Sequence, residues 1–220
     1  FDHPKEWKYL IRARECRVLG ISGFSGVSQN SRLVHRLLLS FPKLKLLRIE
    51  TELATRQTLM EKALGDYFQQ GTHKLGIKLQ IHQNNNFDYQ SSQNFYNLLA
   101  DRICFLTLSG SKSQDVIDLT INNYESFTHL KKLEISINSS ENLAFLSKVR
   151  FFPKLKTFNL SVQNLGRQTQ SLLEYFTVPR VIEELRLNVT HWNFNLSETT
   201  ADQQEYYLSF INKFSGLNSL

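Results

Sequence analysis

The 220-residue sequence predicts an α/β solenoid in which a curved parallel sheet forms the concave side and helices cover the convex side. Three observations predict this fold. A short apolar motif recurs along the chain, apolar and polar residues alternate within each copy as in a strand, and apolar residues at helical spacing occupy the intervals between copies. One such unit cannot bury its apolar stripe alone, so neighbouring units must stack. We therefore expect a single domain over residues 1–220.

The recurring motif is clearest in four segments with the spacing F-x-x-L-x-x-[LF], which begin at Phe41, Phe127, Phe152 and Phe214. We number each repeat from the first leucine of this motif, which is position 1; in weaker copies another residue occupies that position. Repeats then start near residues 16, 44, 76, 103, 130, 155 and 182, and a partial repeat starts at 217. The intervals of 25 to 35 residues are typical of stacked structural repeats.

Each repeat predicts one strand, because apolar residues at positions 4, 6 and often 8 alternate with polar ones. Apolar residues at helical spacing follow within residues 33–41, 59–68, 95–99, 143–149 and 172–176. Residues 1–15 carry Trp7, Leu10 and Ile11 at the same spacing and predict an N-terminal helix. Every repeat is therefore expected to contribute a strand, a turn and a helix.

These repeats, with Asn84 and Asn138 at position 9, resemble those of leucine-rich-repeat proteins. Their length and helical segments are similar to the ribonuclease-inhibitor type and to the repeat regions of F-box substrate receptors, over about residues 16 to 220. The chain does not begin with Met, and the motif at Phe214 runs up to its last residue. We therefore expect the sequence to be a fragment of a longer chain.

The concave face is the predicted partner-binding surface, because positions 3, 5 and 7 of each repeat point away from the core. Apolar residues at position 3, namely Val18, Leu46 and Phe105, resemble the anchors of interface cores, unless another segment of the chain covers them. The candidate contact residues on this face are Leu46, Arg48, Gln80, His82, Phe105, Thr107, Glu134, Asn159 and Arg186.

Positive charge is concentrated at one end of the chain. Residues 1–50 hold ten Lys and Arg against four acids, whereas residues 51–220 hold 16 of each. The strand starts predict a basic rim formed by Arg17, Lys43, Lys45, Lys131 and Lys156. Such a rim would attract an acidic protein segment or, less favoured, nucleic acid; a solvated basic face is the simpler alternative.

The sequence predicts no catalytic residue, no metal ligand set and no cofactor. Its six His form no H-E-x-x-H pattern, and the glycine-rich segment at 20–26 lacks the Lys-Ser/Thr of a phosphate loop. No apolar run approaches the roughly 18 residues of a membrane span. Cys16 and Cys104 would lie about 15 Å apart on a parallel sheet, too far to pair. Unpaired thiols favour an intracellular location, either cytoplasm or nucleus.

The leading hypothesis is thus a non-enzymatic protein–protein interaction scaffold within a longer chain or a multi-subunit complex. Two alternatives remain open. One is the substrate-receptor subunit of a ubiquitin ligase, and the other is a nucleic-acid-binding subunit that uses the basic N-terminal end.

Overall fold

The computed structural model describes residues 16–21, 31–52, 58–70, 75–83, 89–110, 114–137, 143–164 and 182–191. The predicted N-terminal helix at 1–15, the helical group at 172–176 and the partial repeat from 217 lie outside these ranges.

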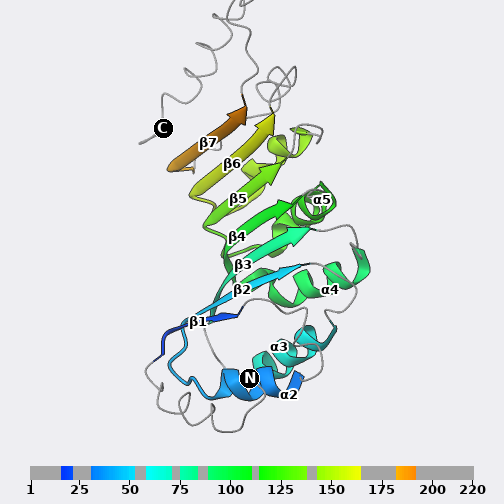
Figure 1. Ribbon diagram of the computed structural model, residues 1–220. Coiled ribbons are helices and arrows are strands. Elements are labelled where there is room, and N and C mark those ends of the chain that lie inside the picture. Colours follow the sequence, from blue (N-terminus) through cyan, green and yellow to red (C-terminus); the bar gives the residue numbers. More distant parts are fainter. Residues whose placement is uncertain are drawn as a thin grey trace, which may run out of the picture.

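Within these ranges, seven strands form one parallel sheet in which each strand pairs with the next one along the chain (Figure 1). All seven fall on predicted repeats, which confirms the parallel α/β class. The strands are β1 (Val18–Ile21), β2 (Leu46–Glu52), β3 (Gly76–Gln83), β4 (Ile103–Gly110), β5 (Lys132–Ile137), β6 (Thr157–Asn164) and β7 (Glu184–His191).

The described helices lie on one face of the sheet and leave the other face open (Figure 1). They are the α-helices α2 (Ser31–Leu39), α3 (Thr58–Gln70), α4 (Tyr89–Leu99) and α5 (Gln114–Asn122), and the 3-10 helices η1 (Ala100–Arg102), η2 (Tyr124–Ser126) and η3 (Leu143–Phe151). The segment at 143–149, with its helical spacing, thus forms a 3-10 helix. It belongs to the shortest repeat, and a 3-10 helix rises about 2.0 Å per residue against 1.5 Å for an α-helix, so fewer residues span the layer.

The core lies between the sheet and the helices, where large aromatic side chains join neighbouring repeats. The rings of Tyr96 and Phe127 meet edge to face at 5.6 Å between centroids, and those of Phe127 and Phe152 at 5.9 Å. Tyr96 Oη lies 3.0 Å from Thr120 Oγ1. Burial raises the pKa of Tyr96 well above its ordinary value, against the opposing effect of the Thr120 hydrogen bond. The tyrosine therefore stays neutral at physiological pH.

The register between β2 and β3 differs from the predicted one by two residues. In the repeat numbering, which we call the frame, Arg48 and Gln80 are both at position 5 and are expected to lie beside each other. The structure instead pairs Arg48 with Lys78. The reason is that Leu75, Ile77, Leu79 and Ile81 alternate strictly and are all buried, so a slip of two residues leaves every side chain on its own face. The frame from β3 to β7 otherwise holds, with Gln80 beside Thr107, Thr107 beside Glu134, and Glu134 beside Asn159.

An irregularity in β4 gives β3 and β4 their predicted pairing beyond Ile77, while the two-residue slip relative to β2 persists through β7. Ile77 pairs with Ile103, but the next residue, Lys78, pairs with Phe105, so Cys104 is an extra residue in β4. Without it, strict alternation would turn Phe105 toward the buried side that Ile103 occupies. The bulge instead leaves Phe105 half-buried on the open face.

Candidate protein-binding surface

The outward-facing residues of the strands form rows across the open face of the sheet. One row runs Gly20, Arg48, Lys78, Phe105, Lys132, Thr157 and Glu184. The next row runs Glu50, Gln80, Thr107, Glu134, Asn159 and Arg186. The nine residues predicted for this face all lie on it, but the structure gathers only some of them around one feature.

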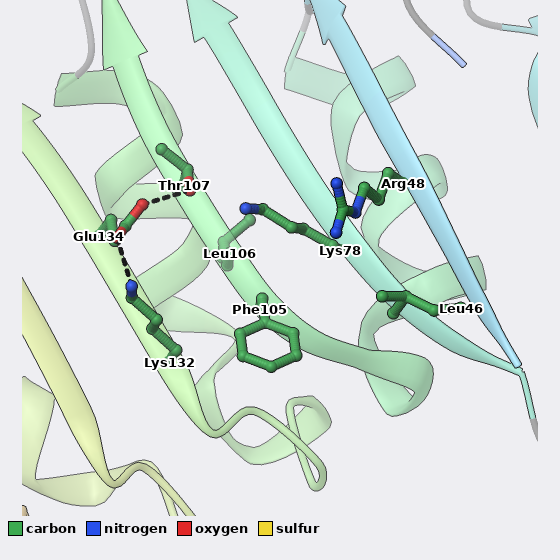
Figure 2. A pocket seen from close by; sticks show the side chains of 8 residues that line it. All are labelled: Leu46, Arg48, Lys78, Phe105, Leu106, Thr107, Lys132 and Glu134. Atoms are coloured by element: carbon green, nitrogen blue, oxygen red, sulfur yellow. Dashed lines mark hydrogen bonds and ion pairs between the residues drawn. The ribbon is translucent and has the colours of Figure 1, made fainter. Parts of the chain in front are cut away.

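That feature is a hollow of about 220 Å³ over β2 to β5, which we call the cationic hollow (Figure 2). Its lining combines apolar and charged side chains from neighbouring strands. The lining residues are Leu46, Arg48, Lys78, Phe105, Leu106, Thr107, Lys132 and Glu134. Of the predicted contact residues, Gln80, His82, Asn159 and Arg186 lie outside this lining. Lys78 and Lys132 were not among the predicted contacts, although their place at position 3 of their repeats was a usable signal.

Glu134 is the centre of a hydrogen-bonded network on one side of the hollow. Lys132 Nζ lies 2.8 Å from Glu134 Oε1, and Thr107 Oγ1 donates to Glu134 Oε2 at 2.9 Å. Asn159 Nδ2 donates to Glu134 Oε1, also at 2.9 Å. Partial burial raises the pKa of Glu134, but these hydrogen bonds and the charge of Lys132 outweigh it, so the pKa falls below its ordinary value. The carboxylate therefore remains charged and fixes the orientation of Lys132.

Arg48 and Lys78 are on the other side of the hollow, as Figure 2 shows. They occupy register-paired positions on β2 and β3, and strands in a sheet are about 4.8 Å apart. Among the residues that the structure describes, neither cation has a carboxylate partner. Two adjacent like charges repel each other, so an anion placed between them would remove that repulsion.

Leu46 and Phe105 supply the apolar part of the hollow. Both are half-buried, whereas Val18 at the equivalent position of β1 is 45% exposed. Leu46 lies over Gly76, where an added Cβ would be in ordinary contact with Leu46 Cδ1 at 3.7 Å and would crowd Cys104 Sγ at 3.2 Å. The predicted apolar anchors are therefore present on the open face, although only Val18 is strongly exposed.

A second polar cluster surrounds His82 on β3. Ser109 Oγ lies 2.7 Å from His82 Nδ1, while Glu50 Oε1 and Gln80 Nε2 lie 3.4 Å and 3.0 Å from His82 Nε2. A serine, a histidine and a carboxylate in this order resemble a nucleophile, a base and an acid. The hydroxyl of Ser109, however, also donates a hydrogen bond to the carbonyl oxygen of Ile81 at 3.4 Å, so it is held by the backbone as well as by His82. We therefore assign this cluster a hydrogen-bonding role.

The predicted basic rim follows the starts of the strands. The backbone N–H of Lys45 donates to the Arg17 carbonyl at 2.8 Å, and that of Lys156 to the Lys131 carbonyl at 2.9 Å. Arg17, Lys43, Lys45, Lys131 and Lys156 are all exposed. The rim changes sign at β7, where Glu183 Oε1 lies 2.5 Å from Lys156 Nζ. Lys156 is thus paired within the chain, which leaves the positive charge of the rim concentrated nearer β1 and β2.

Other kinds of site find less support in the described ranges. Cys16 and Cys104 are both free thiols, as the predicted separation requires. Within those ranges, no three His, Cys, Asp or Glu residues come together in a way that could hold a metal ion. Nor does any described helix have the length and apolar character needed to cross a membrane.

Comparisons of this chain with protein-family models, with curated proteins and with solved structures found no match. Its class and function therefore have to be inferred from the residues and contacts described above.

The Glu134 network predicts a pH-dependent contribution to stability. Because the folded-state pKa lies below the unfolded value, the charged carboxylate stabilises the fold at neutral pH, and this stabilisation is lost as the pH falls through the folded-state pKa. Glu134→Gln should therefore lower the urea midpoint at neutral pH and change it little in strong acid. Asp66→Asn, at an exposed position on α3, is the control and should have little effect at either pH. An equal loss at both pH values for Glu134→Gln would contradict the electrostatic origin.

Proposed function

We propose that this chain is a non-enzymatic protein-interaction scaffold of the leucine-rich-repeat class, which binds its partner on the open face of the sheet. The observation that carries the proposal is the cationic hollow, where half-buried Leu46 and Phe105 lie beside two cations without described acid partners. Interface cores combine apolar anchors with arginine in this way. The helices that the structure describes occupy the opposite face, so the open face is the surface on which the described strands can meet another molecule.

Four features support the assignment to the leucine-rich-repeat class. The strands are parallel, follow the chain order and recur at the predicted interval. The motif leucines Leu44, Leu130 and Leu155 are buried, as an inward repeat position requires. We therefore propose that the units stack as a solenoid, with the open face as its concave side. The two free cysteines support an intracellular setting for this scaffold.

Nucleic-acid binding is the second candidate, and the exposed cations Arg17, Lys45 and Lys131 favour it. Carboxylates on the open face weigh against it, because Glu184 lies in the same row as Arg48, Lys78 and Lys132, and Glu50 and Glu134 lie in the next row. A phosphate backbone that crosses the sheet would run past these negative charges. Protein binding therefore remains the proposal.

Site-specific photo-crosslinking tests which face binds. A photoreactive amino acid at Ser161, which is on the open face of β6, is compared with one at Leu39, which is 46% exposed on α2. We expect the same protein adduct to form repeatedly from position 161 and not from position 39, in cells that express the chain. Adducts from position 39 alone would contradict the proposal, because they would place the binding surface on the helix side. Crosslinks to nucleic acid alone from position 161 would favour the second candidate.

A further inference from the structure

We propose that the cationic hollow is a docking site for an acidic, extended peptide segment of a partner protein. In this arrangement one apolar side chain of the peptide packs on Phe105 and Leu46, and its neighbouring carboxylates bind Arg48 and Lys78. The inference rests on the proposed function, since it names the chemistry of the partner that the open face binds.

The charges of the hollow favour a carboxylate-bearing partner. Three cations and one carboxylate line it, and the carboxylate, Glu134, is already held by Lys132, Thr107 and Asn159. The positive charge left over is that of Arg48 and Lys78. A guanidinium can hold a carboxylate through two parallel N–H···O bonds, and a lysine ammonium adds a second positive charge beside it. An acidic side chain over this pair gains attraction and relieves the repulsion between the two cations.

The size and lining of the hollow favour a peptide side chain over a small-molecule ligand. By itself its volume of about 220 Å³ is below the roughly 300 to 1,000 Å³ of most small-molecule pockets, and together with a neighbouring hollow that shares Arg48 and Lys78 it forms an elongated surface across β1 to β5, which suits an extended chain. The half-buried Phe105 ring lies between the cation pair and the Lys132–Glu134 pair, as Figure 2 shows. An aromatic or aliphatic side chain placed on this ring would cover apolar surface that water now contacts.

A second hollow lets the peptide continue across the sheet. It has a volume of about 370 Å³ and shares Arg48 and Lys78 with the first. Its lining also includes Gly20, where a Cβ would meet no atom within 4 Å, so the surface over β1 is open. Five neighbouring strands from β1 to β5 span about 19 Å, which roughly six residues of extended chain cover. An extended segment that crosses the strands would thus contact both hollows.

Acidic peptide is favoured over nucleic acid at this site. Glu50 lines the second hollow and Glu134 lines the first, so a carboxylate lies on each side of the cation pair. A peptide can place its acids on Arg48 and Lys78 and uncharged residues elsewhere. A nucleic acid carries a phosphate at every nucleotide and would bring some of them close to these carboxylates.

Fluorescence anisotropy with a labelled probe tests the docking site. The probe is the hexapeptide Glu-Asp-Phe-Asp-Glu-Leu, and its partner probe is the amide form Gln-Asn-Phe-Asn-Gln-Leu. We expect the 220-residue chain to bind the acidic peptide about tenfold or more tightly than the amide form, with an advantage that shrinks as salt rises. The double reversal Arg48→Glu/Lys78→Glu should weaken binding of the acidic peptide by about tenfold or more.

Matched variants separate the site from general electrostatics. Lys62→Glu/Lys154→Glu changes the net charge equally at two exposed positions outside the hollow and should leave the affinity within about twofold. The neutral variant Arg48→Gln/Lys78→Gln, with the folded state checked by thermal unfolding, should also weaken binding and guards against misfolding of the reversal. Equal weakening by both double reversals would overturn the site, and so would displacement of the peptide by single-stranded oligonucleotide at equal concentration.

Photo-crosslinking of the charge variants distinguishes failure of the docking site from failure of the proposed scaffold function. A protein adduct at position 161 that persists unchanged in Arg48→Glu/Lys78→Glu would leave the scaffold function standing and overturn the docking site. Loss of that adduct in the double reversal, with retention in Lys62→Glu/Lys154→Glu, would support it. Crosslinks that join position 161 only to the same chain, or only to a second copy, would show a different occupant and overturn the proposal.

Discussion

Phe152→Ala should destabilise the fold by about 3 to 5 kcal/mol, whereas Phe151→Ala should cost at most about 1 kcal/mol. The two phenylalanines are neighbours in the sequence, but the side chain of Phe152 is 1% exposed and that of Phe151 is 45% exposed. Truncation of Phe152 removes a ring that packs edge to face on Phe127 at 5.9 Å and on Tyr124 at 6.4 Å. The vacated space lies inside the core, where surrounding side chains relax only in part.

Phe151 provides a control of the same chemistry at a different depth. Its ring lies 5.4 Å from that of Tyr124 and 4.8 Å from the guanidinium of Arg150, so its removal costs a surface ring contact and a cation–π contact. Urea unfolding of the two single variants and the parent chain measures the difference. Similar free energies of unfolding for the two variants would contradict the assignment of Phe152 to the core.

The parallel α/β fold could be predicted because the same motif, with the same spacing of apolar residues, recurs several times along the chain. Most copies place apolar residues at positions 1, 4 and 6, so weak copies at Cys16 and Ile182 are recognised through stronger ones. Helix α5 was not singled out, although it buries Val116, Ile117, Leu119, Thr120 and Ile121. Ile117, Leu119 and Ile121 alternate with Asp118 and Thr120, a period of two that is typical of a strand and hides the helix.

The open face could be predicted, but the cationic hollow could not. Which residues face outward depends only on alternation, and that survives a two-residue slip. Which outward residues become neighbours depends on the register, and the strict alternation in β3 is compatible with more than one register. Arg48 therefore lies beside Lys78 and not beside Gln80. The contacts of Glu134 were within reach of the sequence, because Lys132 lies two residues away on the same face and the frame from β4 to β6 is regular.

Leu133→Ala should cost about 2 to 5 kcal/mol, because Leu133 is fully buried on β5 between Leu106 of β4 and Phe158 of β6. The control is Lys132→Ala, which removes the ion pair with Glu134 at a half-exposed site and should cost between about 0 and 1 kcal/mol. Urea unfolding of both variants measures the free energies. Comparable losses would mean that the alternation does not separate core from surface on this strand.

The same variant tests the proposed stacking of repeats. In a solenoid each unit contacts only its neighbours, so a cavity at Leu133 weakens the interfaces with β4 and β6 more than those with distant strands. Amide hydrogen exchange in Leu133→Ala should therefore accelerate most in β4, β5 and β6 and least in β2. Uniform acceleration from β2 to β7 would instead indicate one globally cooperative core, and it would count against the stacked-repeat architecture while leaving the parallel sheet intact.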